Sequence, residues 1–188
     1  MLQLGVKMRF ILIAIIVFGC SQQQSVEVPR FSGVKAFQYL EKQCEFGPRN
    51  PGSIGHKEFA NYLENFLKER FDNILIQDFE YIEPVTESLR KGKNFIVQFN
   101  QDAKYRLLIG AHWDTRAISD QDKNIEHKTL PVLGANDGGS GTAILMTLYD
   151  MFTANEPPIG IDLVFFDAED VGRSFEGNTF AVGSEFFS

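Results

Sequence analysis

Hydrophobic residues recur every three or four positions in two early stretches of the chain, and this spacing predicts two amphipathic helices. The first stretch covers residues 34–45, where Phe37 and Leu40 fall on one face. The second has Ser53 as a plausible N-cap, apolar positions from Phe59 onward, and its end at about Arg70. Between them, residues 46–53 are dense in glycine and proline, which is typical of a loop rich in turns.

Four further stretches have the patterns of β-strands. Residues 74–81 alternate between apolar and polar side chains, and residues 94–99 form a second strand, with 83–93 as a long hairpin loop between the two. The runs 105–111 and 161–166 are apolar almost throughout. Continuous apolar runs of this length are typical of strands that are buried on both faces.

A helix is expected between these two buried strands, over residues 138–152. The order strand, helix, strand favours a parallel connection, so we expect an α/β fold with a mixed, largely parallel central sheet flanked by helices. The length of 188 residues fits one domain of ordinary size.

The start of the chain resembles an export signal. Lys7 and Arg9 precede an apolar run over residues 10–18, which is too short to cross a bilayer as a helix. The run ends in the sequence Val-Phe-Gly-Cys at Cys20, which resembles a bacterial lipoprotein box, in which the cysteine is acylated and becomes the mature N-terminus. An ordinary signal peptide followed by a chance cysteine is the alternative.

The chain therefore divides into three expected parts. Residues 1–19 are a lipoprotein signal peptide, residues 20–33 are the lipidated Cys20 with a polar tether, and residues 34–188 are the domain. With Cys20 acylated, Cys44 has no partner for an intrachain disulfide, and its apolar neighbours indicate a small core residue. The protein is expected to be exported and lipid-anchored to the cell membrane or outer membrane, facing the periplasm or the exterior.

The charge balance argues against binding to nucleic acid. Lysine and arginine total 18, aspartate and glutamate total 25, and the net charge is −7. A protein that grips phosphates needs a basic face, so we expect no nucleic-acid partner.

Polar residues follow both buried strands at the point where each ends. The first strand leads into His112 and Asp114, and the second leads into Glu169 and Asp170. The carboxyl ends of strands are where open α/β folds place their sites. Because His112 and Asp114 are two apart, their side chains face the same way, and the carboxylate can fix the imidazole tautomer. The alternatives are a structural histidine and a solvated acidic loop.

A glycine-rich segment at 134–141 lies between these two groups. It lacks the lysine of a phosphate-binding loop and the second glycine of a serine-hydrolase elbow. It presents Asp137 at a turn, among residues that allow a metal or substrate to approach closely. The candidate ligands of zinc or a hard cation are therefore His112, Asp137 and Asp170, with Glu169 left as acid and base.

Five motifs follow one another along residues 47–187. They are Gly47-Pro-Arg-Asn-Pro-Gly-Ser-Ile-Gly-His56, His112-Trp-Asp-Thr-Arg116, Gly134-Ala-Asn-Asp-Gly-Gly-Ser-Gly141, Phe165-Phe-Asp-Ala-Glu-Asp170 and Gly183-Ser-Glu-Phe-Phe187. In this order they resemble the zinc exopeptidases of metallopeptidase family 28, and most of all its glutaminyl-peptide cyclotransferases (glutaminyl cyclases) of bacterial lipoprotein type. Trp113, Arg116 and the segment 120–122 favour the cyclase branch, with Trp113 expected on the substrate side of the site.

The resemblance implies a role for each candidate. Asp137 is a zinc ligand that bridges two ions in the aminopeptidases and binds one in the cyclases. Glu169 is the general acid and base, and Asp170 is the next metal-binding carboxylate. His112 binds the second zinc in aminopeptidases and lies near the site without binding metal in cyclases, and Asp114 supports it.

The resemblance also implies the reaction, the cofactor and the partners. A cyclase holds one Zn²⁺ and converts the N-terminal glutamine of a peptide to pyroglutamate with release of ammonia, whereas an aminopeptidase holds two and removes N-terminal residues. The expected partners are peptides with a free N-terminus, and the membrane through Cys20. The family has a third zinc ligand beyond Gly183-Ser-Glu, so we expect a zinc exopeptidase-like sandwich that is incomplete at its C-terminus. A shortened lipoprotein that only binds peptides is the remaining alternative.

Overall fold

The computed structural model describes residues 28–188 except 72–73, 85 and 173–178. The expected signal peptide, the acylated Cys20 and most of the tether lie outside the described residues, so they stay predictions. Within the described part of the chain, no helix is both long enough and apolar enough to cross a membrane.

The two predicted N-terminal helices are confirmed. Helix α1 covers Gly33–Glu45 and helix α2 covers Ile54–Lys68. Each begins after a serine, Ser32 and Ser53, whose side-chain oxygen accepts a hydrogen bond from a backbone N–H of the first turn. The apolar spacing that predicted α2 places Phe59, Leu63 and Leu67 in the core. In α1, by contrast, Phe37 is 59% exposed.

The described strands form one mixed sheet. They are β1 (Leu75–Ile82), β2 (Leu89–Phe99), β3 (Arg106–His112) and β4 (Gly160–Phe166), in the order β1-β2-β4-β3. The mixed α/β architecture is confirmed, but the parallel part is smaller than expected. Only β3 and β4, which are joined through a helix, pair in parallel among the described strands. The other two pairings are antiparallel, since β1 and β2 form a hairpin and β2 then runs against β4.

Strand β2 is longer than its sequence predicted. Residues 89–93, expected in the hairpin loop, form its first part. Their charged side chains give the stretch the composition of a loop, but charge is tolerated where a strand faces solvent. Lys91, for example, lies opposite Glu80 of β1 and forms an ion pair with it at 3.6 Å.

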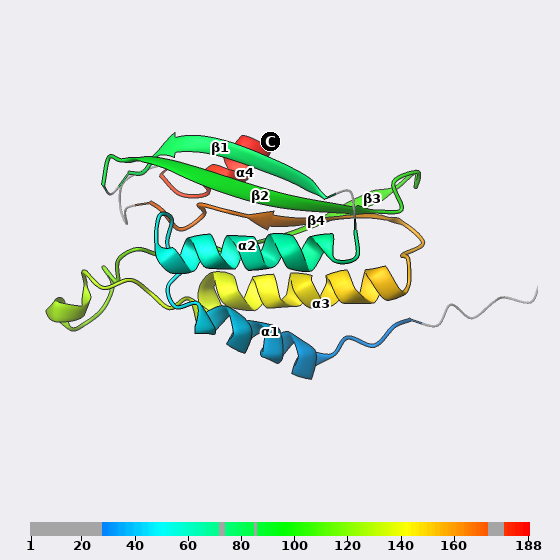
Figure 1. Ribbon diagram of the computed structural model, residues 1–188, viewed down its shortest axis with the longest axis horizontal. Coiled ribbons are helices and arrows are strands. Elements are labelled where there is room, and N and C mark those ends of the chain that lie inside the picture. The colour runs from blue at the N-terminus through cyan, green and yellow to red at the C-terminus, as the bar shows by residue number, and fades with distance from the viewer. Residues whose placement is uncertain (1–27, 72–73, 85, 173–178) are drawn as a thin grey trace, which may run out of the picture.

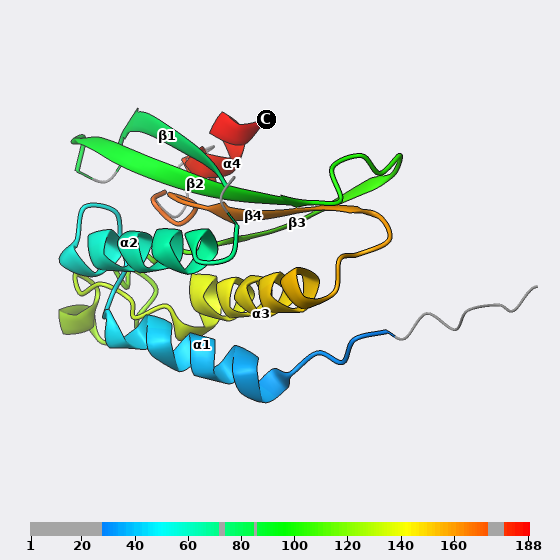
Figure 2. The same cartoon turned by 45° about the vertical axis from the view of Figure 1, so that its right-hand side comes forward.

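The helices lie on both sides of the sheet. Helices α2 and α3 (Gly141–Ala154) cover one face, and α1 packs against α3 farther from the sheet (Figures 1 and 2). The short helix α4 (Val182–Phe187) lies on the opposite face, where Phe186 stacks on Phe79 of β1. The main core fills the space between the sheet and the helices; its largest fully buried apolar members are Phe59, Leu63, Leu67, Phe95, Phe99, Trp113, Leu145, Met146, Tyr149, Leu163 and Phe165.

The two strands that were expected to be buried on both faces have different surroundings. Strand β4 is buried along most of its length, as predicted. Strand β3 lies at the edge of the described sheet, and Leu107 and Leu108 are 52% and 48% exposed. The apolar sequence of β3 therefore fits an interior strand, but in the described structure only one neighbour, β4, pairs with it.

Candidate functional site

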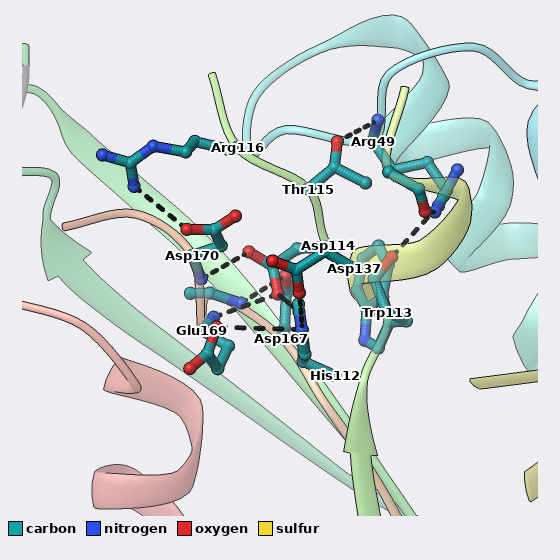
Figure 3. Close-up of polar contacts among 12 residues, drawn as sticks. Arg49, His112, Trp113, Asp114, Thr115, Arg116, Asp137, Asp167, Glu169 and Asp170 are labelled. Carbon is teal, nitrogen blue, oxygen red and sulfur yellow. Dashed lines mark hydrogen bonds and ion pairs between the residues drawn. The ribbon is translucent and has the colours of Figure 1, made fainter. Parts of the chain in front are cut away.

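The candidate site forms where the parallel strands β3 and β4 end side by side (Figure 3). Their pairing continues one step past β3, since the Trp113 N–H donates to the Phe166 carbonyl at 2.9 Å. The segments that follow the two strands therefore enter the same region. A turn over Ala135–Ser140, ahead of α3, also lies in this region and carries Asp137. Parallel pairing thus explains why residues far apart in sequence gather here.

His112 lies at the centre of three carboxylates. Its Nε2 is 2.9 Å from Asp137 Oδ1 and 3.8 Å from Glu169 Oε2, and its Nδ1 is 3.3 Å from Asp114 Oδ1. Burial by itself lowers the pKa of His112, but Asp114 above all, and then Glu169 and Asp137, outweigh it and raise the pKa to about 9. The imidazole is therefore cationic at neutral pH in the metal-free chain.

Asp114 does more than support His112. Its side chain is fully buried, and its two oxygens accept the backbone N–H groups of Glu169 at 3.0 Å and of Asp170 at 3.1 Å. One carboxylate thus holds the turn that presents both acidic residues. Hydrogen bonds of this kind, to an ionised acceptor, are among the stronger ones in proteins. Sequence spacing predicted the contact with His112 but gave no sign of the contact with the turn.

The sequence patterns do not predict a buried pair that lies beneath the turn. Asp167 is fully buried, and His56 Nε2 lies 2.9 and 3.1 Å from its two oxygens. Burial raises the pKa of Asp167, and His56 opposes the shift. Asp167 also accepts the Lys93 N–H at 2.8 Å, which ties the turn to β2. The one available signal was the position of Asp167 directly after a buried strand.

Glu169 and Asp170 share a turn but face different partners. Glu169 is 39% exposed on the His112 side, and burial raises its pKa while His112 opposes the shift. Asp170 is more enclosed, and its Oδ1 accepts a hydrogen bond from Arg116 Nη1 at 3.0 Å. Burial raises the pKa of Asp170 to about 6, against the pull of Arg116. Arg116 is itself held by two hydrogen bonds to Asp120.

Asp137 stands on a turn that only glycine permits. Gly134 and Gly138 have φ angles of +66° and +79°, in the left-handed region that favours glycine. A Cβ on Gly138 would lie 2.4 Å from the Asp114 carbonyl oxygen, so the turn packs directly on the segment that follows β3. The Asp137 side chain itself is 71% exposed. The glycines therefore bring backbone against backbone and leave the carboxylate open to solvent.

Comparison with known proteins identifies the family. The model for peptidase family M28 matches residues 94–188, which include every candidate side chain of the site described above except His56. The chain belongs to peptidase family M28. A search of curated proteins finds no match for it.

Solved structures similar to the M28 protein include cyclases and exopeptidases. Tannerella forsythia glutaminyl cyclase is 35% identical with a TM-score of 0.79, and covers 85% of this chain and 56% of its own. Bacteroides thetaiotaomicron glutaminyl cyclase bound to N-acetylhistamine is 34% identical with a TM-score of 0.79, covering 86% and 57%. A Zn-dependent exopeptidase from Parabacteroides distasonis is 33% identical with a TM-score of 0.77, covering 86% and 56%. The M28 protein thus spans little more than half the length of these chains.

Trp113 does not lie on the substrate side of the M28 site, and that prediction is wrong. Its side chain is fully buried and stacks on His56, with ring centroids 4.5 Å apart. Its indole N–H donates to the Lys93 carbonyl at 3.2 Å. Neighbouring residues of an extended segment point to opposite sides, so Trp113 enters the core where His112 and Asp114 face the site.

The described residues do not complete a metal site. No group of three or more histidine, cysteine, aspartate or glutamate side chains within them is arranged to hold a metal ion. Asp170 is paired with Arg116, and Asp137 with His112. A catalytic zinc takes three protein ligands, and within the described residues the three candidates His112, Asp137 and Asp170 are not arranged around one position. Family M28 and its Zn-dependent relatives suggest that the protein uses zinc.

Proposed function

We propose that the M28 protein is a zinc-dependent glutaminyl-peptide cyclotransferase, which converts the N-terminal glutamine of peptides to pyroglutamate and releases ammonia. The observation that carries this proposal is its similarity, at 35% and 34% identity, to structures of glutaminyl cyclases from Tannerella forsythia and Bacteroides thetaiotaomicron. The proposal concerns the whole protein, since the chain spans little more than half the length of these relatives.

The geometry around Glu169 supports the proton transfers that this reaction needs. The α-amine of the glutamine must lose a proton as it attacks the side-chain amide carbon, and the departing nitrogen must gain one. The partly exposed Glu169 carboxyl, with a pKa raised by burial, is suited to accept the first proton and return it. Holding the amine beside the amide carbon would supply much of the acceleration.

A second function is favoured by another similar structure. A leucine aminopeptidase precursor from Bacteroides thetaiotaomicron is 32% identical with a TM-score of 0.76. In an aminopeptidase, Glu169 would take a proton from the water that attacks the first peptide bond. The same carboxyl would then protonate the departing amine, so one residue serves either reaction.

The decisive experiment offers the whole protein one peptide with an N-terminal glutamine and measures both products. Ammonia release with loss of the free amine supports the cyclase, whereas release of free glutamine supports the aminopeptidase. The same peptide with an acetylated N-terminus is the control, because it has no amine to attack or to recognise. Binding of the peptide without either product would overturn both and leave the peptide-binding lipoprotein.

We also propose that the protein is exported and attached to a membrane through Cys20. The proposal rests on the lipoprotein-like sequence that ends at this residue. Labelled fatty acid should enter the wild-type protein and not a Cys20→Ser variant. Equal labelling of both would overturn it.

A further inference from the structure

Arg49 is an arginine that is buried completely, and its charge is not paired with an acid. Its side chain has no exposed surface. Among the described residues, no carboxylate lies within 4.0 Å of its guanidinium. Burial lowers the pKa of Arg49 from its ordinary value, which reflects the cost of placing a charge in the core. A residue retained at such a cost calls for an explanation beyond packing.

The guanidinium is satisfied by backbone carbonyls instead. Its three nitrogens lie 3.0–3.4 Å from five carbonyl oxygens. These oxygens belong to three separate segments of the chain: the end of α1 and the loop after it, the segment after β3, and the start of the glycine turn. In that order, the residues are Gln43 and Gly47, Trp113, and Leu133 and Gly134.

Two of those segments carry site residues. Trp113, whose carbonyl is 3.1 Å from Arg49 Nε, lies between His112 and Asp114. Gly134, whose carbonyl is 3.0 Å from Nη2, opens the turn that presents Asp137. The Arg49 backbone adds a further link, since its N–H donates to Thr115 Oγ1 at 2.8 Å (Figure 3).

The turn needs such support because Asp137 makes little contact of its own. The Asp137 side chain is 71% exposed, yet its Oδ1 lies 2.9 Å from His112 Nε2. Side-chain packing therefore does not fix the distance between these two residues, and the backbone on either side must. A planar guanidinium with five N–H donors in a fixed arrangement can hold two segments in one relative position, whereas a lysine ammonium cannot.

We propose that Arg49 is a positioning residue, which sets the Asp137 turn against the His112–Asp114 segment by binding the backbone of both. Its role in turnover rests on the function proposed above, whereas its role in holding the turn is independent of the reaction. Arg49 touches neither substrate nor reacting atoms in this assignment.

The test compares Arg49→Lys with a matched arginine at the other end of β3. Arg106 also donates to three backbone carbonyls, those of Phe99, Asn100 and Gln101. It lies six residues before His112 on the same strand, or about 20 Å away. Arg106→Lys therefore removes comparable hydrogen bonds without reaching the site.

Both variants are made in the full chain, and two quantities are measured. The first is the position of the backbone amide signals of Asp137 and Gly138 in an NMR spectrum at one fixed pH. The second is the split between kcat and KM on the glutamine peptide. Arg49→Lys should move or broaden both amide signals and lower kcat about 10- to 100-fold with KM nearly unchanged, because misplacement acts on the chemical step. Arg106→Lys should lower the unfolding temperature and leave both quantities alone.

The proposal is overturned if both variants lose similar stability and the two amide signals stay in place in each. If Arg49→Lys does not fold, Thr115→Val decides, since it removes only the hydroxyl that accepts the Arg49 N–H. Unmoved signals in that variant also overturn the proposal. If the wild-type protein releases no product from any peptide, the proposed function fails. The amide signals still test whether Arg49 positions the Asp137 turn.

Discussion

Single carboxylates hold most of the site together. Asp114 is the clearest case, because it contacts the His112 ring and accepts the backbone N–H groups of Glu169 and Asp170. Asp167 has a similar role deeper in the structure, where it contacts the His56 ring and accepts a backbone N–H of β2. The exposed residues that can take part in chemistry are thus held in place by buried carboxylates that cannot.

Asp114→Asn should destabilise the fold. The amide has one acceptor oxygen where the carboxylate has two, so one N–H of the turn would lose its partner and meet an NH₂ group instead. We expect the free energy of unfolding to fall by roughly 2–3 kcal/mol, measured by urea denaturation. Asp102→Asn, at an exposed position, is the control and should change little. Equal stability of the two variants would contradict the role given to Asp114.

Glu169→Gln should abolish turnover while preserving the fold. The amide is nearly the same size but cannot accept and return a proton, so we expect kcat to fall about 10²- to 10⁴-fold. Ammonia release from a glutamine peptide measures the effect, and circular dichroism checks the fold. Glu126→Gln, in the exposed turn at Ile125–His127, is the control. Turnover that survives in Glu169→Gln would refute the acid–base assignment.

At the scale of elements, the ends of the strands carry different kinds of polar pairs. The carboxyl ends of β3 and β4 hold the site, and the opposite ends are joined by Arg106 and Asp162. Two hydrogen bonds, of 2.6 and 3.1 Å, link this guanidinium and carboxylate. Arg106 also contacts the backbone that connects β2 to β3, so the pair holds three strands in register.

The Arg106–Asp162 pair should make stability depend on pH in the acid range. Arg106 holds the pKa of Asp162 below its ordinary value of 3.8. A carboxyl whose pKa is lower in the folded state stabilises the protein above about pH 3.8, and this contribution is lost as pH falls through the folded-state pKa. Asp162→Asn should therefore cost about 1 kcal/mol at pH 7, with the difference from wild type shrinking toward pH 2.

Urea denaturation at a series of pH values measures this dependence. Asp102→Asn, at an exposed position, is the control and should change the free energy of unfolding little at any pH in this range. A cost of Asp162→Asn that stays the same from pH 7 to pH 2 would contradict the ion pair.

At the scale of the whole molecule, the sequence predicted well what local pattern determines. Periodicity gave the helices and the buried strand β4, and the placement of polar residues after buried strands gave the site cluster. The sequence did not predict features that depend on contacts between residues far apart in the chain. The His56–Asp167 pair spans 111 residues, and no local pattern signals such a contact. Side chains alternate along an extended segment, so Trp113 points into the core although His112 and Asp114 on either side of it face the site. Treating these three residues as a single motif hides this alternation.

The edge of β3 that no described strand covers should cause self-association. Leu108 lies on this edge with 48% of its surface exposed, and an unpaired apolar strand is a template for pairing with another chain. Sedimentation of the chain should show a larger apparent mass at high concentration. Leu108→Lys should reduce this effect, because a lysine on an edge strand opposes pairing.

The control for this prediction is Leu130→Lys, at a loop position that is 52% exposed. It adds the same charge without touching the sheet edge, and should associate as the wild-type chain does. A wild-type chain that stays monomeric at every concentration, or a Leu130→Lys variant that behaves like Leu108→Lys, would contradict a role for β3.

The burial of Trp113 also provides the protein with an optical reporter. It is the one tryptophan in the sequence, and it lies between His112 and Asp114, packed against His56 and the core. An indole in an apolar, water-free environment emits at shorter wavelengths than one in water. The tryptophan fluorescence of the chain therefore comes from the segment that carries two of the site residues, so a red shift of that emission would report loosening of this segment in particular.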